Sequence, residues 1–99
     1  FACKPAAAVA SARRAGTTAS IDALGKYFGI SRMLTVGSTY WSMVHGNCPA
    51  DVLQDREGLQ TMRNLAREMA WLMRCIETAR AAGICPPAPE RTERTNFIR

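Results

Sequence analysis

The sequence predicts an α/β protein: a βαβα unit that forms the C-terminal part of a doubly wound parallel sheet. Two short apolar stretches, at residues 5–11 and 30–36, have the length of buried strands. Each precedes a polar loop and a helical pattern, which is the order of parallel strands that alternate with helices. A unit of this size covers neither both faces nor both edges of its sheet. We therefore expect a missing N-terminal half or a partner chain to complete it.

Composition and charge exclude several classes of protein. The 99 residues allow one domain at most, with 47% hydrophobic and 21% charged residues. The net charge is +5, but Arg13-Arg14 is the single basic doublet, which disfavours a nucleic-acid partner. No apolar run reaches the ~18 residues of a membrane span, so no membrane partner is expected. The cysteines match no zinc spacing and indicate reduced thiols in a cytoplasmic protein without a metal site; they are Cys3, Cys48, Cys75 and Cys85.

The first half of the unit is predicted from small residues followed by a helical period. Residues 5–11 are rich in alanine, which suits a strand against which helices pack closely on both faces. Ile21, Leu24 and Phe28 then recur at the spacing of one helix face. Gly29 is expected to end this helix. Its start is expected at a hydroxyl residue, namely Thr17, Thr18 or Ser20.

The second half repeats the order with a longer loop and a longer helix. A strand is predicted at residues 30–36, followed by a loop of small polar and aromatic residues at 37–46. A short helical turn is expected near Pro49. Asp55 is expected to cap a long helix that runs to about residue 82, where Gly83 stops it.

The long helix has two faces. One apolar arc is expected to pack on the sheet; it comprises Leu59, Met62, Leu65, Ala66, Met69, Leu72, Met73, Ile76 and Ala79. A separate line of arginines is interpreted as a solvated face: Arg56, Arg63, Arg67 and Arg74. Trp71 lies off the apolar arc, which suggests a subunit contact or a patch that the tail covers.

Two regions of the chain are therefore predicted. Residues 1–85 form the βαβα part, and residues 86–99 form an extended, proline-containing tail. Phe97 and Ile98 would allow the end of this tail to dock, while a disordered end is the alternative.

The loops that follow parallel strands meet at the carboxyl edge of a sheet, where ligands of open α/β sheets bind. The first loop offers hydroxyl, guanidinium and backbone donors to an anionic or electron-rich ligand; its candidate contacts are Ser11, Arg13, Arg14, Gly16, Thr17 and Thr18. The second loop carries Tyr40, Trp41 and His45, which suit stacking on a flat ring and contact with its polar edge. Together they predict a site for a planar, hydrogen-bonding cofactor.

Each of these residues also has a structural interpretation. Thr17 could serve only as a helix cap, and Tyr40 and Trp41 could lie at a subunit boundary, where aromatic residues are common. His45, the single histidine, is more often a structural hydrogen-bonding residue than a catalyst. No motif of a hydrolase, a P-loop or a dinucleotide fingerprint is present. We expect no general acid or base among these residues.

Four segments carry recognisable motifs. They read KPAAAVASARRAGTT at residues 4–18, YWSMVHGN at 40–47, EGLQTMRNLAREMAW at 57–71 and TNFIR at 95–99. These segments resemble the C-terminal half of the flavodoxin-like NAD(P)H-dependent FMN reductases. The resemblance implies a five-stranded doubly wound parallel sheet, bound FMN, a nicotinamide dinucleotide as electron donor, and assembly into dimers or tetramers.

The resemblance also assigns roles to the two loops. It implies that residues 11–18 form a flavin-side loop, with Arg13, Arg14 and Gly16 near the ring. It implies that residues 40–46 belong to the same flavin pocket or cover that of a neighbouring subunit. The family's phosphate-binding loop would lie in the N-terminal half. The expected function is an FMN-dependent NAD(P)H oxidoreductase, and the alternative is a non-catalytic interaction module whose open sheet another chain completes.

Overall fold

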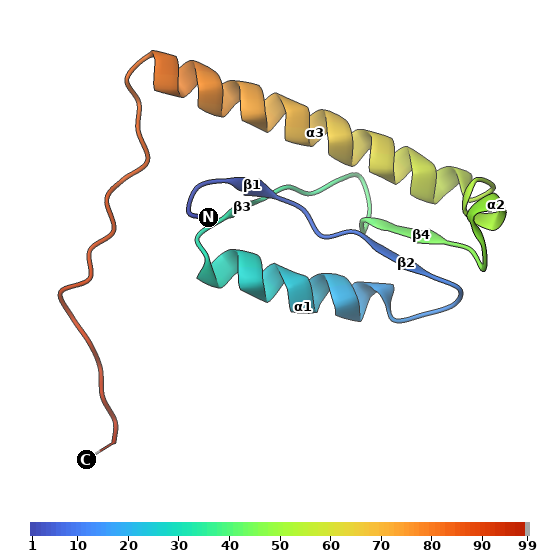
Figure 1. Ribbon diagram of the computed structural model, residues 1–99, viewed down its shortest axis with the longest axis horizontal. Helices are drawn as coiled ribbons and strands as arrows, with labels where there is room; N and C mark the ends of the chain where they lie inside the picture. The colour runs from blue at the N-terminus through green and yellow to red at the C-terminus, as the bar shows by residue number, and fades with distance from the viewer. Residues whose placement is uncertain (99) are drawn as a thin grey trace.

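The computed structural model describes residues 1–98. Strands and helices follow one another as β1 (Pro5–Ala6), β2 (Ala10–Ala12), α1 (Thr17–Ile30), β3 (Leu34–Thr35), β4 (Met43–His45), α2 (Pro49–Val52) and α3 (Arg56–Ala81). Figure 1 shows that α1 lies along one side of the strands and α3 along the other. The mixed α/β class is confirmed, while the flavodoxin-like topology stays a prediction.

The strands pair in parallel in two short sheets. β1 pairs with β3, and β2 pairs with β4, with Ala12 opposite His45 at the end of the second pair. Residues 36–42 separate β3 from β4, whereas only residues 7–9 separate β1 from β2. The chain between β3 and β4 must therefore bulge out of the ladder, and we call this bulge the 36–42 loop.

The hydrogen bonds show where this bulge leaves and rejoins the ladder. The Val36 N–H donates to the Ala6 carbonyl at 2.8 Å, and the Ala10 N–H donates to the Ser42 carbonyl at 3.0 Å. Val36 and Ser42 are both buried at these two points. The loop thus begins and ends at fixed positions, although it interrupts the sheet.

Three strand predictions need correction. The single strand expected at residues 5–11 is divided into β1 and β2, because the segment of the same chain that pairs with it leaves the ladder between β3 and β4. The strand expected at residues 30–36 is only β3, because α1 continues through Ile30 and a turn at Arg32, with φ 57°, follows it. The expected loop at 37–46 contains β4, because Met43–His45 find partners in β2.

The ends of α2 and α3 agree with the local signals, but those of α1 do not. Gly16 occupies the N-cap of α1 in place of the expected hydroxyl residue, and the helix continues past Gly29, its expected last position, to Ile30. The Asp55 side chain caps α3 by accepting from the Gly58 N–H, and Pro49 occupies the first turn of α2. At the other end of α3, Gly83 has φ 79° and the Ile84 N–H donates to the Ala79 carbonyl at 2.8 Å. This backbone arrangement is a Schellman stop, for which glycine is the preferred residue.

The two long helices pack on the strands, but they bury little. α1 contacts β2 and β3, and α3 contacts β1 and β4. The buried hydrophobic residues among those described are Ala6, Val36 and Leu65. Most of the predicted apolar arc of α3 is half-buried, but Ala66 and Met73 are exposed, contrary to expectation. The four arginines of the solvated face and Trp71 are exposed.

The overall dimensions agree with a thin core. The accessible surface is 8116 Å², whereas a compact monomer of this mass exposes roughly 5,500 Å². The radius of gyration is 17.5 Å, against about 13 Å for a compact chain of this length. The described chain, with its extended residues 86–98, therefore exposes more surface than a compact chain of its mass, and large apolar side chains such as Tyr27, Ile30 and Trp71 belong to that surface.

Residues 86–98 contain no helix or strand and are exposed. Phe97 and Ile98 are 91% and 87% exposed, so they do not dock on the body of their own chain. The extended course that the sequence predicted is observed (Figure 1), while the division into two regions at residue 86 stays a prediction. Within residues 1–98, no helix has an apolar stretch sufficient to cross a bilayer.

Candidate functional site

The parallel pairing of β2 with β4 brings two connections to one end of the strands. Ala12, the last residue of β2, lies opposite His45, the last residue of β4. The Gly46 N–H then donates to the Ala12 carbonyl at 3.2 Å. The loop of residues 13–16 and the turn of residues 46–48 therefore start side by side, at the carboxyl edge where α/β proteins bind ligands.

The first connection leads into a helix start that lacks a side-chain cap. Gly16 has φ 94°, a left-handed conformation that an L side chain rarely adopts. No side chain accepts a hydrogen bond at this end of α1, and its first turn contains no acidic residue. Arg13 and Arg14 precede it and are both exposed. Uncapped N–H groups beside two cations favour an anionic or electron-rich ligand.

The hydroxyl groups predicted for this site lie in different surroundings. Thr17 is 5% exposed, and its Oγ1 donates to Met43 Sδ at 3.2 Å, which connects α1 to β4. Ser11 and Thr18 are exposed. The hydroxyl of Thr17 is thus engaged inside the fold, whereas those of Ser11 and Thr18 face solvent.

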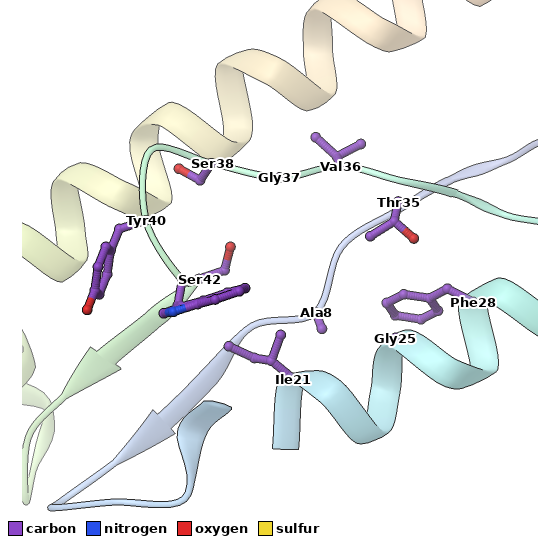
Figure 2. Close-up of a pocket in the computed structure, with 11 residues that line it drawn as sticks. Ala8, Ile21, Gly25, Phe28, Thr35, Val36, Gly37, Ser38, Tyr40 and Ser42 are labelled. Atoms are coloured by element: carbon purple, nitrogen blue, oxygen red, sulfur yellow. The ribbon is translucent and has the colours of Figure 1, made fainter. Parts of the chain in front are cut away.

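A cavity of about 480 Å³ lies between α1 and the 36–42 loop. Figure 2 shows Ile21 and Phe28 projecting from α1 towards the segment that carries Ala8. Tyr40 and Trp41 line it from the 36–42 loop. We call this cavity the aromatic groove; the remaining lining residues are Gly25, Thr35, Val36, Gly37, Ser38 and Ser42. A concave, mainly apolar surface of this size has the character of a ligand or peptide site.

The groove begins close to the first connection. Ile21 follows Thr17 by four residues, about one turn of α1. The uncapped start of α1 and the aromatic groove therefore share the same helix and adjoin along it. A flat ligand with one polar edge could contact donors at the helix start while its apolar face lies in the groove.

Two hydrogen bonds hold the 36–42 loop on α3. Ser38 Oγ donates to the Thr61 carbonyl at 2.7 Å, and Asn64 Nδ2 donates to Thr39 Oγ1 at 3.0 Å. Tyr40 and Trp41 are nevertheless 59% and 56% exposed. The loop is thus anchored through its polar residues and presents its aromatic residues, which lowers the entropy cost of binding.

His45 lies in a different, smaller cavity of about 200 Å³, which Tyr40 and Asp55 also line. Asp55 Oδ2 accepts the His45 main-chain N–H at 2.7 Å, and Asp55 Oδ1 accepts the Gly58 N–H at 2.9 Å. The imidazole Nδ1 of His45 is 4.0 Å from Asp55 Oδ2. The N–H donors of Gly58 and His45 lower the pKa of Asp55 below its ordinary value.

The predicted site residues are thus distributed over three adjoining places. Arg13, Arg14 and Gly16 lie at the carboxyl edge, Trp41 lines the aromatic groove, and His45 lines the smaller cavity. Tyr40 lines both cavities. Sequence reasoning identified Asp55 as a cap but missed its bond to β4, and it missed the contribution of α1 to the groove, although the period of Ile21 and Phe28 could have indicated it.

The structure contains, within residues 1–98, no cluster of three or more His, Cys, Asp or Glu side chains that could hold a metal ion. Comparison of the chain with protein-family models, with curated protein sequences and with solved structures found no match.

Proposed function

We propose that this chain is the C-terminal part of an FMN-dependent NAD(P)H oxidoreductase, to which it contributes flavin-side loops. The supporting observation is the parallel pairing of β2 with β4, which brings the loop of residues 13–16 to the carboxyl edge beside the uncapped start of α1. The resemblance of four sequence segments to the flavodoxin-like FMN reductases supports the same proposal, because it implies that residues 11–18 form a flavin-side loop. We also propose that the protein is cytoplasmic, because its four cysteines are free thiols in the structure.

The residues present are chemically suited to a flavin. An isoalloxazine ring has a polar edge rich in acceptors and two apolar faces. The guanidinium groups of Arg13 and Arg14 and the N–H groups at the start of α1 are donors for the polar edge. Ile21 and Trp41 in the aromatic groove are suited to an apolar face. In this proposal, Ser11, Gly16, Thr17 and Thr18 shape the flavin-side loop.

When bound, FMN would supply the redox chemistry, accepting a hydride from a nicotinamide and passing electrons to a second acceptor. The residues of this chain would bind the ring, orient it and limit access of water. Tyr40, Trp41 and His45 would shape the substrate side or cover the flavin of a neighbouring subunit. None of them is proposed to act as a general acid or base.

The test uses the full-length protein and its affinity for FMN, measured by quenching of flavin fluorescence. Arg13→Ala combined with Arg14→Ala should raise the Kd for FMN about 10- to 100-fold, the effect of losing charged hydrogen-bond donors. The matched control, Arg56→Ala with Arg63→Ala, removes two exposed arginines of α3 and should leave the Kd within about twofold. A full-length protein that takes up no flavin, or equal Kd values for the two double variants, would contradict the proposal.

The large exposed surface favours a second candidate function, that of an interaction module. The described chain exposes roughly 2,600 Å² more than a compact monomer of its mass. This observation suits a non-catalytic interaction module whose open sheet another chain completes. The absorption spectrum of the purified full-length protein separates the two functions: flavin bands that persist after gel filtration favour the oxidoreductase, and a colourless protein in a stable hetero-complex favours the module.

A further inference from the structure

Two cysteines that are far apart in the sequence line one cavity. Cys3 lies in the turn before β1, and Cys85 lies two residues after Gly83, which stops α3. The cavity has a volume of about 250 Å³, and its other walls come from the start of β3, the last turns of α3 and residues 84–87. We call this cavity the cysteine pocket and residues 84–87 the base of the tail.

Hydrogen bonds hold the two cysteine-bearing segments at one point of the fold. The Cys3 N–H donates to the Arg32 carbonyl at 2.8 Å. The side chain of Arg32 reaches the base of the tail, where its Nη2 donates to the Pro87 carbonyl at 3.4 Å. Arg32 therefore binds the turn of Cys3 through its main chain, and the chain just beyond Cys85 through its guanidinium group.

The backbone at this junction is in an uncommon conformation. Cys3 has φ 59° and Arg32 has φ 57°, and among residues 1–98 they are the non-glycine residues with a positive φ. Side chains disfavour this left-handed conformation, so it persists where the surrounding structure holds it. The two residues are joined directly by the hydrogen bond between the Cys3 N–H and the Arg32 carbonyl. The position of Cys3 beside the base of the tail is therefore set before any covalent bond forms.

The dimensions of the cysteine pocket suit a disulfide after a small movement. A sphere of the volume of this pocket is roughly 8 Å across, whereas the Cα atoms of bridged cysteines lie about 4.4–6.8 Å apart. Cys85 can make the necessary movement, because it is exposed and lies in a segment without helix or strand. Cys3, in its fixed turn, would then act as the stationary partner.

The two thiols differ in access to solvent, which gives them different roles in thiol–disulfide exchange. Cys85 is exposed, whereas Cys3 is partly covered. Arg80 is the charged residue that lines the pocket with them, and electropositive, partly exposed surroundings are typical of cysteines that react. Cys48 and Cys75 are also exposed, but neither lines this pocket.

We propose that Cys3 and Cys85 form a reversible disulfide when a low-molecular-weight disulfide such as glutathione disulfide accumulates. The Cys85 thiolate attacks one sulfur of glutathione disulfide, which forms a mixed disulfide and releases one glutathione thiolate. Cys3 then attacks the Cys85 sulfur and releases the second. Two protein thiols are thereby oxidised, one glutathione disulfide is reduced to two thiols, and the protons of the cysteines pass to the released thiolates.

The structure with free cysteines is then the reduced form, and the oxidised form has the base of the tail fixed to the turn before β1. Transient, redox-sensing disulfides are the kind that a cytoplasmic protein forms. The site does not depend on flavin binding. Cys3 precedes β1 and lies at the amino edge of the strands, opposite the proposed flavin-side loops.

The first experiment maps the disulfide in the full-length protein after equilibration in glutathione buffers of increasing oxidation. Free thiols are blocked, and tryptic peptides are separated without reduction. The wild type should give a peptide that contains Cys3 linked to residues 81–91, which contain Cys85. Cys3→Ser should instead retain glutathione on Cys85, because the second attack can no longer occur.

The matched control replaces the other two cysteines. Cys48→Ser with Cys75→Ser should give the linked peptide in the yield of the wild type. Mixing isotope-labelled and unlabelled chains before oxidation should leave every linked peptide wholly labelled or wholly unlabelled. Thiols that stay free in the most oxidising buffer, glutathione retained on both Cys3 and Cys85 of the wild type, or linkage to another cysteine or another copy would overturn the proposal.

The second experiment asks whether the bond fits the fold. The oxidised wild type should have a Tm at least about 5 °C above that of the reduced wild type, because a bridge that closes a long loop restricts the unfolded chain. Cys85→Ser in the same oxidising buffer should keep the Tm of the reduced protein. An oxidised wild type with an equal or lower Tm would show that the bond distorts the junction of Cys3 with Arg32, and would contradict the proposal.

Discussion

The starts of the two long helices differ in how they use their free N–H groups. At α3, the Asp55 carboxylate accepts from both Gly58 and His45, and Glu57 adds a negative charge in the first turn. At α1, Gly16 provides no side-chain acceptor and no acidic residue follows. The start of α3 is therefore satisfied within the chain, whereas the start of α1 keeps its positive end available. The comparison indicates that the first is structural and the second suits a ligand.

The largest effect on stability is expected from Gly58→Ala at the start of α3. A Cβ at this position would meet the Asp55 carboxylate and would lie 3.0 Å from the Met43 carbonyl oxygen. We expect a loss of about 1–3 kcal/mol of unfolding free energy, despite the better helix propensity of alanine. Gly25→Ala, where no heavy atom lies within 4 Å of the added Cβ, should instead gain about 0.5–1 kcal/mol. Urea unfolding measures the unfolding free energy of both variants. If Gly58→Ala and Gly25→Ala stabilised the protein equally, the start of α3 would not be tightly packed.

Removal of the Asp55 carboxylate should have the next largest effect. Asp55→Ala leaves the N–H groups of Gly58 and His45 without their acceptor, and it removes the hydrogen bond that joins β4 to the start of α3. We expect the Tm to fall by about 5 °C. Asp22→Ala, which removes an exposed carboxylate from α1, is the control and should change the Tm by less than about 1 °C. A similar Tm for both variants would remove the distinction between the two helix starts.

The same carboxylate should make stability depend on acid. Because the pKa of Asp55 is lower in the folded chain than its ordinary 3.8, its stabilising effect is complete above that value and is lost as the pH falls through the folded pKa. Thermal unfolding between about pH 5 and pH 2 should show this loss in the wild type. In Asp55→Asn the acid-dependent fall should be smaller, since that position no longer titrates. An identical pH profile for the two proteins would exclude Asp55 as a contributor.

The smallest effect is expected from a charge placed at the uncapped start of α1. Ala19→Glu places a negative charge in the first turn of α1, where it should stabilise the helix by about 0.3–1 kcal/mol. In the full-length protein the same charge should compete with an anionic or electron-rich ligand and raise the Kd for FMN about two- to fivefold. Ala19→Gln has nearly the same shape without the charge and should leave the Kd unchanged. A tighter Kd in Ala19→Glu would argue against an electron-rich ligand at this helix start.

Local signals were sufficient for the ends of α3 and for part of the site, but not for the ends of α1. Asp55 and Gly83 mark the ends of α3 because capping and stopping depend on residues within one turn of the helix end. The convergence of residues 13–16 with the end of β4 follows from parallel pairing. The position of Trp41 in a groove with Ile21 could not be predicted, because it depends on how far the 36–42 loop bulges.

By itself, the sequence determined the class of the fold, the long helix with both its ends, and the extended course of the chain after Pro86, since these depend on composition and short-range spacing. Only the tertiary structure decided that the first strand is divided, that Met43–His45 form a strand, and that Asp55 connects β4 to α3. The physical reason is distance along the chain: a strand exists through a partner more than thirty residues away, and its register sets which side chains meet.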